Sequence, residues 1–271
     1  MAKPAKTRES PAEPKESASA IARLIDALSR PDAYPHPVDR VELLETHISY
    51  VLLAGEYAYK IKKPVNLGFL DFSTLDARRR YCEEELRLNR RTAPDIYLAT
   101  VRITGTMATP VLDGTGKTIE HAVKMRRFDQ SALLDNLARQ GDLSPALTDA
   151  IARRIAAFHA TIAIAAPDSP FGTQGHVATP ARENFDQVRA LVGASPDVPQ
   201  LERLRAWTEH EGTRLAPVFA DRKRAGYVRE CHGDLHLGNI ALIGDAPTPF
   251  DCIEFNADLR WIDVMNEVAF L

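Results

Sequence analysis

The part of the sequence that decides the fold is Cys231-His232-Gly233-Asp234-Leu235-His236-Leu237-Gly238-Asn239-Ile240, followed by Phe250-Asp251-Cys252-Ile253-Glu254-Phe255. Asp234 and Asn239 lie five positions apart between two apolar runs, and Asp251 follows twelve positions later. Transfer of a phosphoryl group from ATP needs a carboxylate that orients the attacking hydroxyl and oxygen ligands that hold magnesium on the phosphates. Asp234 suits the first role, and Asn239 and Asp251 suit the second.

The order His-x-Asp-x-x-x-x-Asn, with a further Asp downstream, resembles the catalytic loop and metal-binding Asp of the protein-kinase superfamily. The segment His232-Gly233-Asp234-Leu235-His236-x-Gly238-Asn239 is similar to the motif of a small-molecule kinase branch of that superfamily, the aminoglycoside phosphotransferase family. The resemblance runs from about His36 to the end of the chain. It implies an α+β fold of two lobes, with a small antiparallel-sheet N-lobe over residues 18–127 and a mostly helical C-lobe over residues 128–271.

Members of this family are often fused to a separate C-terminal P-loop domain. The sequence contains no Gly-x-x-x-x-Gly-Lys-Ser/Thr. It stops on the apolar run Ala269-Phe270-Leu271, without a helix-ending Gly or a basic last turn. We therefore expect the C-lobe to be truncated at its C-terminal end and the P-loop domain to be absent.

Two other interpretations of the motif compete with this one. A Gly-Asp-x-His run also occurs in metallophosphoesterases, and His232, Asp234 and His236 resemble a metal cluster. Such sites need further histidines downstream, and no His follows His236. The second alternative is a polar turn between strands without a catalytic role. Such a turn would not require Asp234, His232 and His236 together between two apolar segments. The sequence favours the kinase interpretation over both.

Composition excludes several classes of protein. The 271 residues are 45% apolar and 26% charged, which is ordinary for a globular protein with a sizeable core. A net charge of −3 indicates neither a nucleic-acid nor an anionic-membrane partner. Three Cys without motif spacing indicate reduced thiols, and no membrane span or signal peptide is evident. We expect a cytoplasmic protein.

The N-terminal third contains a tail, a helix and three strands. Residues 1–17 are too polar to repay the entropy of ordering and are predicted to be a disordered tail. An apolar helical period begins near Ala18, and strands are predicted at 41–45, 50–54 and 57–62. The turn between the first two strands covers the phosphates in kinases and is usually Gly-rich. Here it has no Gly, and the hydroxyls of Thr46 and Ser49 are expected to replace it.

The third strand resembles the family's lysine strand, whose ammonium group pairs with the phosphates of the nucleotide. Lys60 is the preferred candidate and Lys62, on the same face, is the alternative. The helix that follows begins at Ser73 or Thr74 and runs to about Thr92. The resemblance implies that one of its acids holds the lysine, and Glu85 is preferred over Glu84.

The remaining strands of the N-lobe form a hairpin, from 97–104 through a turn at 113–116 to 119–128. The prediction is a five-stranded antiparallel sheet. The resemblance makes residues 123–127 the connector whose backbone holds the adenine edge.

The C-lobe begins with helical patterns at 131–139, 145–164, 180–192 and 199–219. His159 lies in the second of them and is interpreted as a buried, hydrogen-bonded core residue. The loop 165–179, which contains two Pro and three Gly, is a candidate border of the acceptor pocket.

The last segment is predicted as strands at 227–230, 240–243 and 249–255 and a helix over 259–271. Within that helix Asp263-x-x-x-Glu267 is similar to the family's pair of acids that brace the catalytic loop. Asp263 is predicted to support the loop. Glu267 stands where the family has Asp, so its role stays open, and His232 and His236 are expected to shape the loop through hydrogen bonds.

Together these features predict an ATP- and magnesium-dependent phosphotransferase that acts on a hydroxyl of a small molecule. Aminoglycosides are only the family label, since the helices carry acids and bases about equally. The alternative is a regulatory pseudokinase that binds nucleotide without turnover. The sequence indicates neither the identity of the acceptor nor the oligomeric state.

Overall fold

Within residues 14–271, which the computed structural model describes, the first unit is an antiparallel sheet of six strands with its helices, and it ends at Ala132. In sheet order the strands are β1 (Val41–Glu45), β2 (Ser49–Ala54), β3 (Tyr57–Lys62), β6 (Glu120–Arg126), β4 (Tyr97–Gly105) and β5 (Pro110–Leu112). The sequence predicted five strands, and the structure has a sixth, β5, at the edge of the sheet. This strand is three residues long and begins with a proline, which suits an edge position and leaves little pattern to detect.

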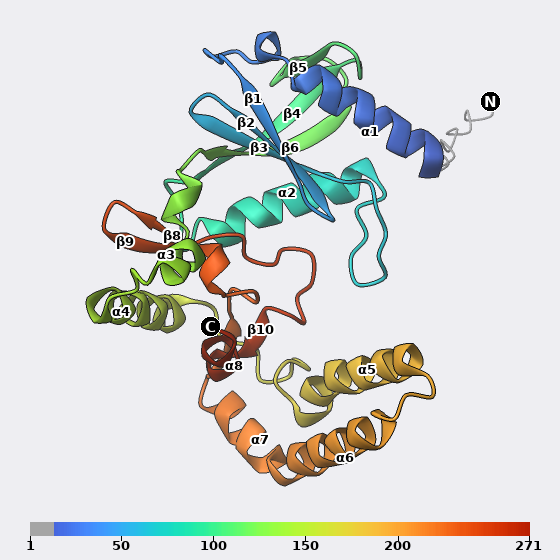
Figure 1. Cartoon of the computed structure of the whole chain (residues 1–271), viewed down its shortest axis with the longest axis vertical. Coiled ribbons are helices and arrows are strands. Elements are labelled where there is room, and N and C mark those ends of the chain that lie inside the picture. The colour runs from blue at the N-terminus through green and yellow to red at the C-terminus, as the bar shows by residue number, and fades with distance from the viewer. Residues whose placement is uncertain (1–13) are drawn as a thin grey trace, which may run out of the picture. The chain divides into compact units, whose positions relative to one another are not determined.

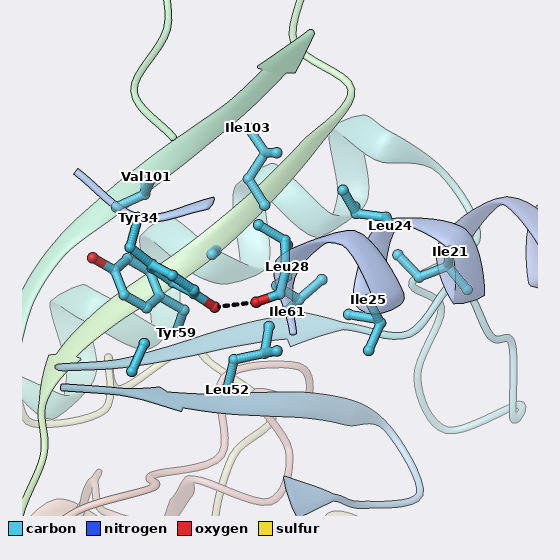
Figure 2. Packing of buried hydrophobic residues seen from close by; sticks show 12 residues of the cluster. Ile21, Leu24, Ile25, Leu28, Tyr34, Leu52, Tyr59, Ile61, Val101 and Ile103 are labelled. Carbon is cyan, nitrogen blue, oxygen red and sulfur yellow. Dashed lines mark hydrogen bonds between the residues drawn. The ribbon is translucent and has the colours of Figure 1, made fainter. Parts of the chain in front are cut away.

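Helix α1 (Pro14–Leu28) packs its apolar stripe on one face of this sheet. Figure 2 shows Leu24 and Leu28 packed with Ile61 of β3, and the hydroxyl of Tyr34 donates to the carbonyl of Leu28 at 2.7 Å. The helix begins at Pro14, four residues before the predicted start. The tail predicted for residues 1–17 lies outside the described residues up to position 13.

Helix α2 (Leu75–Asn89) lies on the opposite face of the sheet (Figure 1). Its N-cap is Thr74, whose hydroxyl oxygen accepts a hydrogen bond from the amide of Ala77 at 3.1 Å. It ends at Asn89, three residues before the predicted end near Thr92. This helix carries the acidic residues considered below.

The second unit, Leu133–Leu271, is mainly helical. Its helices and strands are α3 (Leu134–Gln140), α4 (Pro145–Thr161), α5 (Gln174–Val192), α6 (Val198–Arg214), α7 (Ala216–Arg224), β7 (Val228–Glu230), β8 (Ile240–Ile243), β9 (Ala246–Pro249), β10 (Trp261–Asp263) and α8 (Val264–Phe270). Its core joins Leu134, Ile151 and Ile155 of the helices to Leu235 and Ile240 of the motif. The predicted α+β fold with two lobes is confirmed.

Several predicted boundaries in this unit were wrong. Helix α5 starts at Gln174 and holds Pro180 in its first two turns, so the predicted loop 165–179 is shorter. The predicted helix 199–219 divides at Leu215, because Pro217 starts a new helix as a first-turn residue. The predicted strand 249–255 stops at Pro249, and the last helix begins only after Asp263, which caps it.

No helix in residues 14–271 is both long enough and apolar enough to cross a membrane. The three cysteines, Cys82, Cys231 and Cys252, are buried and unpaired by disulfides.

Candidate active site

Two lysines of β3 meet one glutamate of α2 inside the first unit. Lys60 and Lys62 project from the strand face opposite to Tyr59 and Ile61, because side chains alternate along a strand. The Nζ atom of Lys60 lies 2.8 Å from Oε1 of Glu85, and the Nζ atom of Lys62 lies 2.7 Å from Oε2. All three side chains are buried. The lysine strand is thus joined to the helix by a pair of buried ion pairs.

The neighbouring acid of α2 points elsewhere. Glu84 pairs with Arg87 at 2.7 Å on the outer side of the helix. The structure therefore brings Glu85, and not Glu84, to the lysines. Between the lysines, Lys60 is 8% exposed and Lys62 only 1%. An ammonium group that binds phosphate must reach the surface, which favours Lys60.

A cavity of about 700 Å³ opens on the same side of the sheet as Lys60. In the strand register Lys60 pairs with Val51 of β2, so Leu53 of β2 and its partner Glu42 of β1 share the face of Lys60. Leu53 and Glu42 line the cavity together with residues 126–130. Arg127 crosses it to Glu42 at 3.2 Å. This cavity has the size and the mixed apolar and charged walls that suit a nucleotide base.

In the second unit the motif forms a loop whose backbone is held by Glu267 of α8. Oε1 of Glu267 accepts hydrogen bonds from the amides of His232 at 2.5 Å and Gly233 at 2.8 Å. Oε2 lies 2.6 Å from Nε2 of His159 on α4. Glu267 is 1% exposed, so these bonds are made away from water. One buried carboxylate therefore fixes the loop directly before Asp234.

Asp234, Asn239 and Asp251 come together on this loop. The Nδ2 atom of Asn239 donates to the backbone carbonyl of Asp234 at 2.9 Å and to its Oδ2 atom at 3.1 Å. The amide of Phe250 donates to the carbonyl of Asn239 at 2.9 Å, and the amide of Ile253 donates to that of His232 at 3.1 Å. These two hydrogen bonds lie on either side of Asp251 in sequence, and they join the segment 250–253 to the catalytic loop.

The oxygen donors of this group suit magnesium. Because Asn239 uses its amide nitrogen toward Asp234, its amide oxygen is the atom available to a cation. Amide and carboxylate oxygens are ligands that Mg²⁺ prefers, usually completed by phosphate and water. Asp251 has φ of 62°, an uncommon value for a residue other than glycine. Strained backbone of this kind is concentrated at functional sites.

Comparison with known proteins identifies the family. Residues 67–253 match the sequence profile of the Phosphotransferase enzyme family. The chain belongs to this family. It is also 32% identical over 242 residues to uncharacterized proteins from two strains of Mycobacterium tuberculosis and from Mycobacterium bovis. The matched region is 87% of this chain and 46% of each relative, so the chain spans about half the length of these relatives.

In this member of the phosphotransferase enzyme family, the two β3 lysines are expected to differ in their effect on the reaction rate, although both are paired with Glu85. Lys60→Met is expected to lower the rate of phosphoryl transfer by about a hundredfold, the scale for loss of one preorganised charge-stabilising group. Lys62→Met is expected to change the rate little and to lower the free energy of unfolding by about 1–3 kcal/mol, because a buried Glu85 oxygen loses its donor. Initial rates and urea unfolding of both variants measure this. If Lys62→Met abolishes transfer and Lys60→Met does not, Lys62 has the phosphate role.

The turn between β1 and β2 does not offer its hydroxyls as predicted. Oγ1 of Thr46 lies 2.9 Å from Oγ of Ser49 and accepts the amide of Ser49 at 3.0 Å. Ser49 is only 1% exposed. The two hydroxyl groups thus form hydrogen bonds within the turn. The Nζ atom of Lys63 lies 2.6 Å from Oε1 of Glu45, at the start of the turn. The prediction that Thr46 and Ser49 face phosphates is therefore not supported by their contacts.

The loop contact predicted for Asp263 is made instead by Glu267. Asp263 forms a bidentate ion pair with Arg222, at 2.6 and 2.7 Å, and caps α8 by accepting from the amide of Met265 at 2.8 Å. The prediction was wrong because Asp263 is the residue just before the helix, where its side chain turns back to the first amides. Glu267 is one turn further along and reaches the loop.

The two histidines of the motif hold its shape through backbone hydrogen bonds, His232 with both ring nitrogens and His236 with one. Nε2 of His232 lies 2.8 Å from the carbonyl of Phe250, so it carries the proton, and Nδ1 accepts from the amide of Asp234 at 3.4 Å. Nδ1 of His236 accepts from the amide of Gly238 at 3.1 Å, and its Nε2 lies 3.7 Å from Oδ2 of Asp234. Burial lowers the pKa of His232 below its ordinary value of 6.5, despite the nearby charge of Glu267.

This lowered pKa makes the stability of the second unit depend on pH. Below pH 6.5 the unfolded chain takes up a proton at His232 that the folded chain resists, so folding loses stability as the pH falls. The contribution is complete above pH 6.5 and is lost toward acid at up to about 1.4 kcal/mol per pH unit. Urea unfolding followed by tryptophan fluorescence reports this unit, because both tryptophans, Trp207 and Trp261, lie in it.

The variant His232→Gln should lose this part of the pH dependence, whereas His210→Gln, on the exposed surface of α6, should keep it. Equal slopes between pH 5 and 6.5 in wild type and His232→Gln would contradict a neutral, buried His232.

Two buried ion pairs have no signal in the sequence. Arg78 of α2 binds both oxygens of Glu120 of β6 through Nε at 3.0 and 2.9 Å, and its Nη1 donates to the carbonyl of Phe72 at 2.8 Å. Burial raises the pKa of Glu120, and Arg78 opposes that shift. Arg260 lies near Glu230 at 3.5 Å. The first pair fixes α2, and with it Glu85, on the sheet. Both are scattered charges in sequence, so only the fold reveals them.

A metal cluster of the hydrolase kind does not form around the motif in the described part of the chain. There the group of His, Cys and acidic side chains close enough to share an ion is His159, Cys231 and Glu267, within 4.8 Å of one another. It excludes the motif residues of the His-x-Asp-x-His interpretation. Two of its members are already bonded to each other as the support of the loop.

Proposed function

We propose that this protein transfers the γ-phosphoryl group of ATP to a hydroxyl group of a small molecule, with Mg²⁺ bound beside the nucleotide. The observation that carries this proposal is the loop in which Asn239 holds the Asp234 carboxylate while Glu267 holds the backbone. Catalysis of phosphoryl transfer is mostly positioning and charge stabilisation, which such a loop supplies. Membership of the phosphotransferase enzyme family supports a kinase-like reaction.

The proposed roles follow from the contacts of each residue. Asp234 orients the acceptor hydroxyl and receives its proton, since its carboxylate is part-exposed and held in place by Asn239. The oxygens of Asn239 and Asp251 hold the metal, which when bound neutralises charge on the phosphates. Lys60, fixed by Glu85, binds phosphate, and the cavity beside Leu53 receives the base.

Removal of magnesium tests the cofactor. With Mg²⁺ present, ATP is expected to raise the melting temperature, and a chelator such as EDTA should remove most of this shift and stop transfer. Thermal unfolding with ATP, with and without EDTA, measures binding, and ³¹P NMR of ATP with a panel of alcohols measures turnover. The variant Asp251→Asn should weaken the metal-dependent shift, and Asp245→Asn, on the exposed turn between β8 and β9, should not. No shift with ATP and Mg²⁺ would contradict the proposed function.

The pseudokinase alternative has one observation in its favour. The β1–β2 turn has no Gly, and its two hydroxyls are bonded to each other. Such a turn presents fewer hydrogen-bond donors to the γ-phosphate than a Gly-rich loop, whose backbone amides can point at the phosphate. ATP binding without hydrolysis or transfer, unchanged by Asp234→Asn, would favour this alternative.

A further inference from the structure

A second cavity, of about 760 Å³, lies entirely within the second unit and reaches the catalytic loop. Gly233 and Leu235, the neighbours of Asp234 on both sides, are part of its wall. Gly233 has φ of +88°, and a Cβ atom there would lie 2.7 Å from the carbonyl oxygen of Leu259, which also lines the cavity. Glycine thus lets the loop lie close against this wall. The cavity is therefore next to the residue proposed to orient the acceptor.

One aromatic residue of this wall, Phe270 of α8, lies near His236 of the catalytic loop. Its ring centre lies 6.3 Å from that of His236, and Nε2 of His236 lies 3.7 Å from Oδ2 of Asp234. Phe270 is 58% exposed and is one of the residues that line the cavity. A compound whose hydroxyl is at Asp234 has this ring within reach of the adjoining part of its body.

The walls of the cavity are largely apolar and aromatic. Besides Phe270 they include Trp261 of β10 and Phe219 of α7. Trp261 is held rigidly, since its ring stacks on Phe171 with centres 5.6 Å apart and an angle of 11° between planes. Rigid aromatic faces bind apolar and aromatic ligands with little loss of conformational entropy.

Two of the three acids that line the cavity are held by short hydrogen bonds, and the third, Asp258, lies on the surface. Asp263 is bonded twice to Arg222, and Glu267 is bonded to the loop amides and to His159. Asp258 lies 3.4 Å from Nε2 of His176. A polycation binds by pairing its ammonium groups with carboxylates. Here a polycation would have to break the contacts of Asp263 and Glu267, which also hold α8 and the loop, and only the surface carboxylate of Asp258 would be left to pair with.

We infer that the acceptor is a hydroxyl compound with an uncharged apolar or aromatic body, and not a polycationic aminoglycoside. The inference rests on the proposed function, because the cavity is assigned through its place beside Asp234. The hydroxyl approaches Asp234, and the body lies against Phe270 and Trp261. The cavity accordingly selects on apolar area and not on charge.

Trp261 permits a binding test that does not need turnover. The chain has two tryptophans, so Trp207→Phe leaves Trp261 as the sole reporter. Its fluorescence is titrated with phenyl β-glucoside as the aromatic probe, glucose as the matched polar probe and kanamycin as the polycation. Phenyl β-glucoside is expected to bind at least about tenfold more tightly than either, on the scale of one buried ring. Phe270→Ala should weaken it about fivefold or more, whereas Leu191→Ala, at a side chain 86% exposed on α5, should leave it unchanged.

Tighter binding of kanamycin, equal binding of glucose and phenyl β-glucoside, no binding in any arm, or an effect of Leu191→Ala equal to that of Phe270→Ala would each overturn the inference. Transfer from ATP is measured separately on the same probes. If phenyl β-glucoside binds with the expected selectivity but no alcohol is phosphorylated, the cavity assignment stands and the proposed function fails.

Discussion

Replacement of Asp234 by Asn is expected to lower the rate of phosphoryl transfer by about 10²–10⁴-fold, the usual contribution of a positioned general base. The amide of Asn keeps the size of the side chain but has no negative charge to receive the proton of the acceptor hydroxyl. The affinity for ATP and the free energy of unfolding should change little, since Asp234 is part-exposed. Initial rates, with ATP affinity from thermal shift, measure the two effects.

Asp245→Asn is the matched control, because it makes the same chemical change on an exposed turn of the same unit. It should leave the rate unchanged. A rate of Asp234→Asn within about threefold of wild type would remove Asp234 from the reaction and would favour the nucleotide-binding alternative.

Replacement of Glu267 by Ala is expected to have the largest effect on stability in the second unit. The change leaves the amides of His232 and Gly233 without their acceptor, and it removes the partner of His159. Each buried donor without a partner costs about 1–3 kcal/mol, so the free energy of unfolding should fall by about 2–4 kcal/mol. Since the same bonds position Asp234, transfer should fall as well. Urea unfolding followed by tryptophan fluorescence measures the stability.

Glu267→Gln should have a milder effect, of about 1 kcal/mol, because its amide oxygen still accepts from the loop. Glu183→Ala, an exposed residue on α5, should stay within about 0.5 kcal/mol of wild type. An unfolding free energy of Glu267→Ala equal to that of wild type would mean that the loop does not depend on this carboxylate.

The chemistry of the site was the easiest part to predict. Asp234, Asn239 and Asp251 are close in sequence, and the short segments between them leave few ways to separate them. Lys60 and Glu85 were the preferred candidates from the sequence, but helical phase left Glu84 open and only the structure brings Glu85 to the lysines. The structure has both β3 lysines on this glutamate, so alternation alone does not distinguish them.

The differences between prediction and structure arise from hydrogen-bond geometry and helix boundaries that the residue types alone do not reveal. Asp263 and Glu267 are both acids at suitable spacing, and only the start of α8 decides that Asp263 caps the helix while Glu267 reaches the loop. Thr46 and Ser49 look available in a polar turn, but their hydroxyls bond to each other. Proline is a frequent helix boundary, yet α5 begins at Gln174 and continues through Pro180, so the residue type alone placed the start of this helix too late.

The sequence by itself determined the family, the α+β class and the identity of the motif residues, because these depend on side-chain chemistry and on short spacings along the chain. Only the tertiary structure decided which carboxylate holds the loop and which pairs with Arg222 and caps α8. It also decided that Arg78 binds Glu120 and that two of the three acids of the second cavity are held by short hydrogen bonds. Those outcomes depend on contacts between residues far apart in sequence, where burial and hydrogen-bond geometry select one partner among many similar charged side chains.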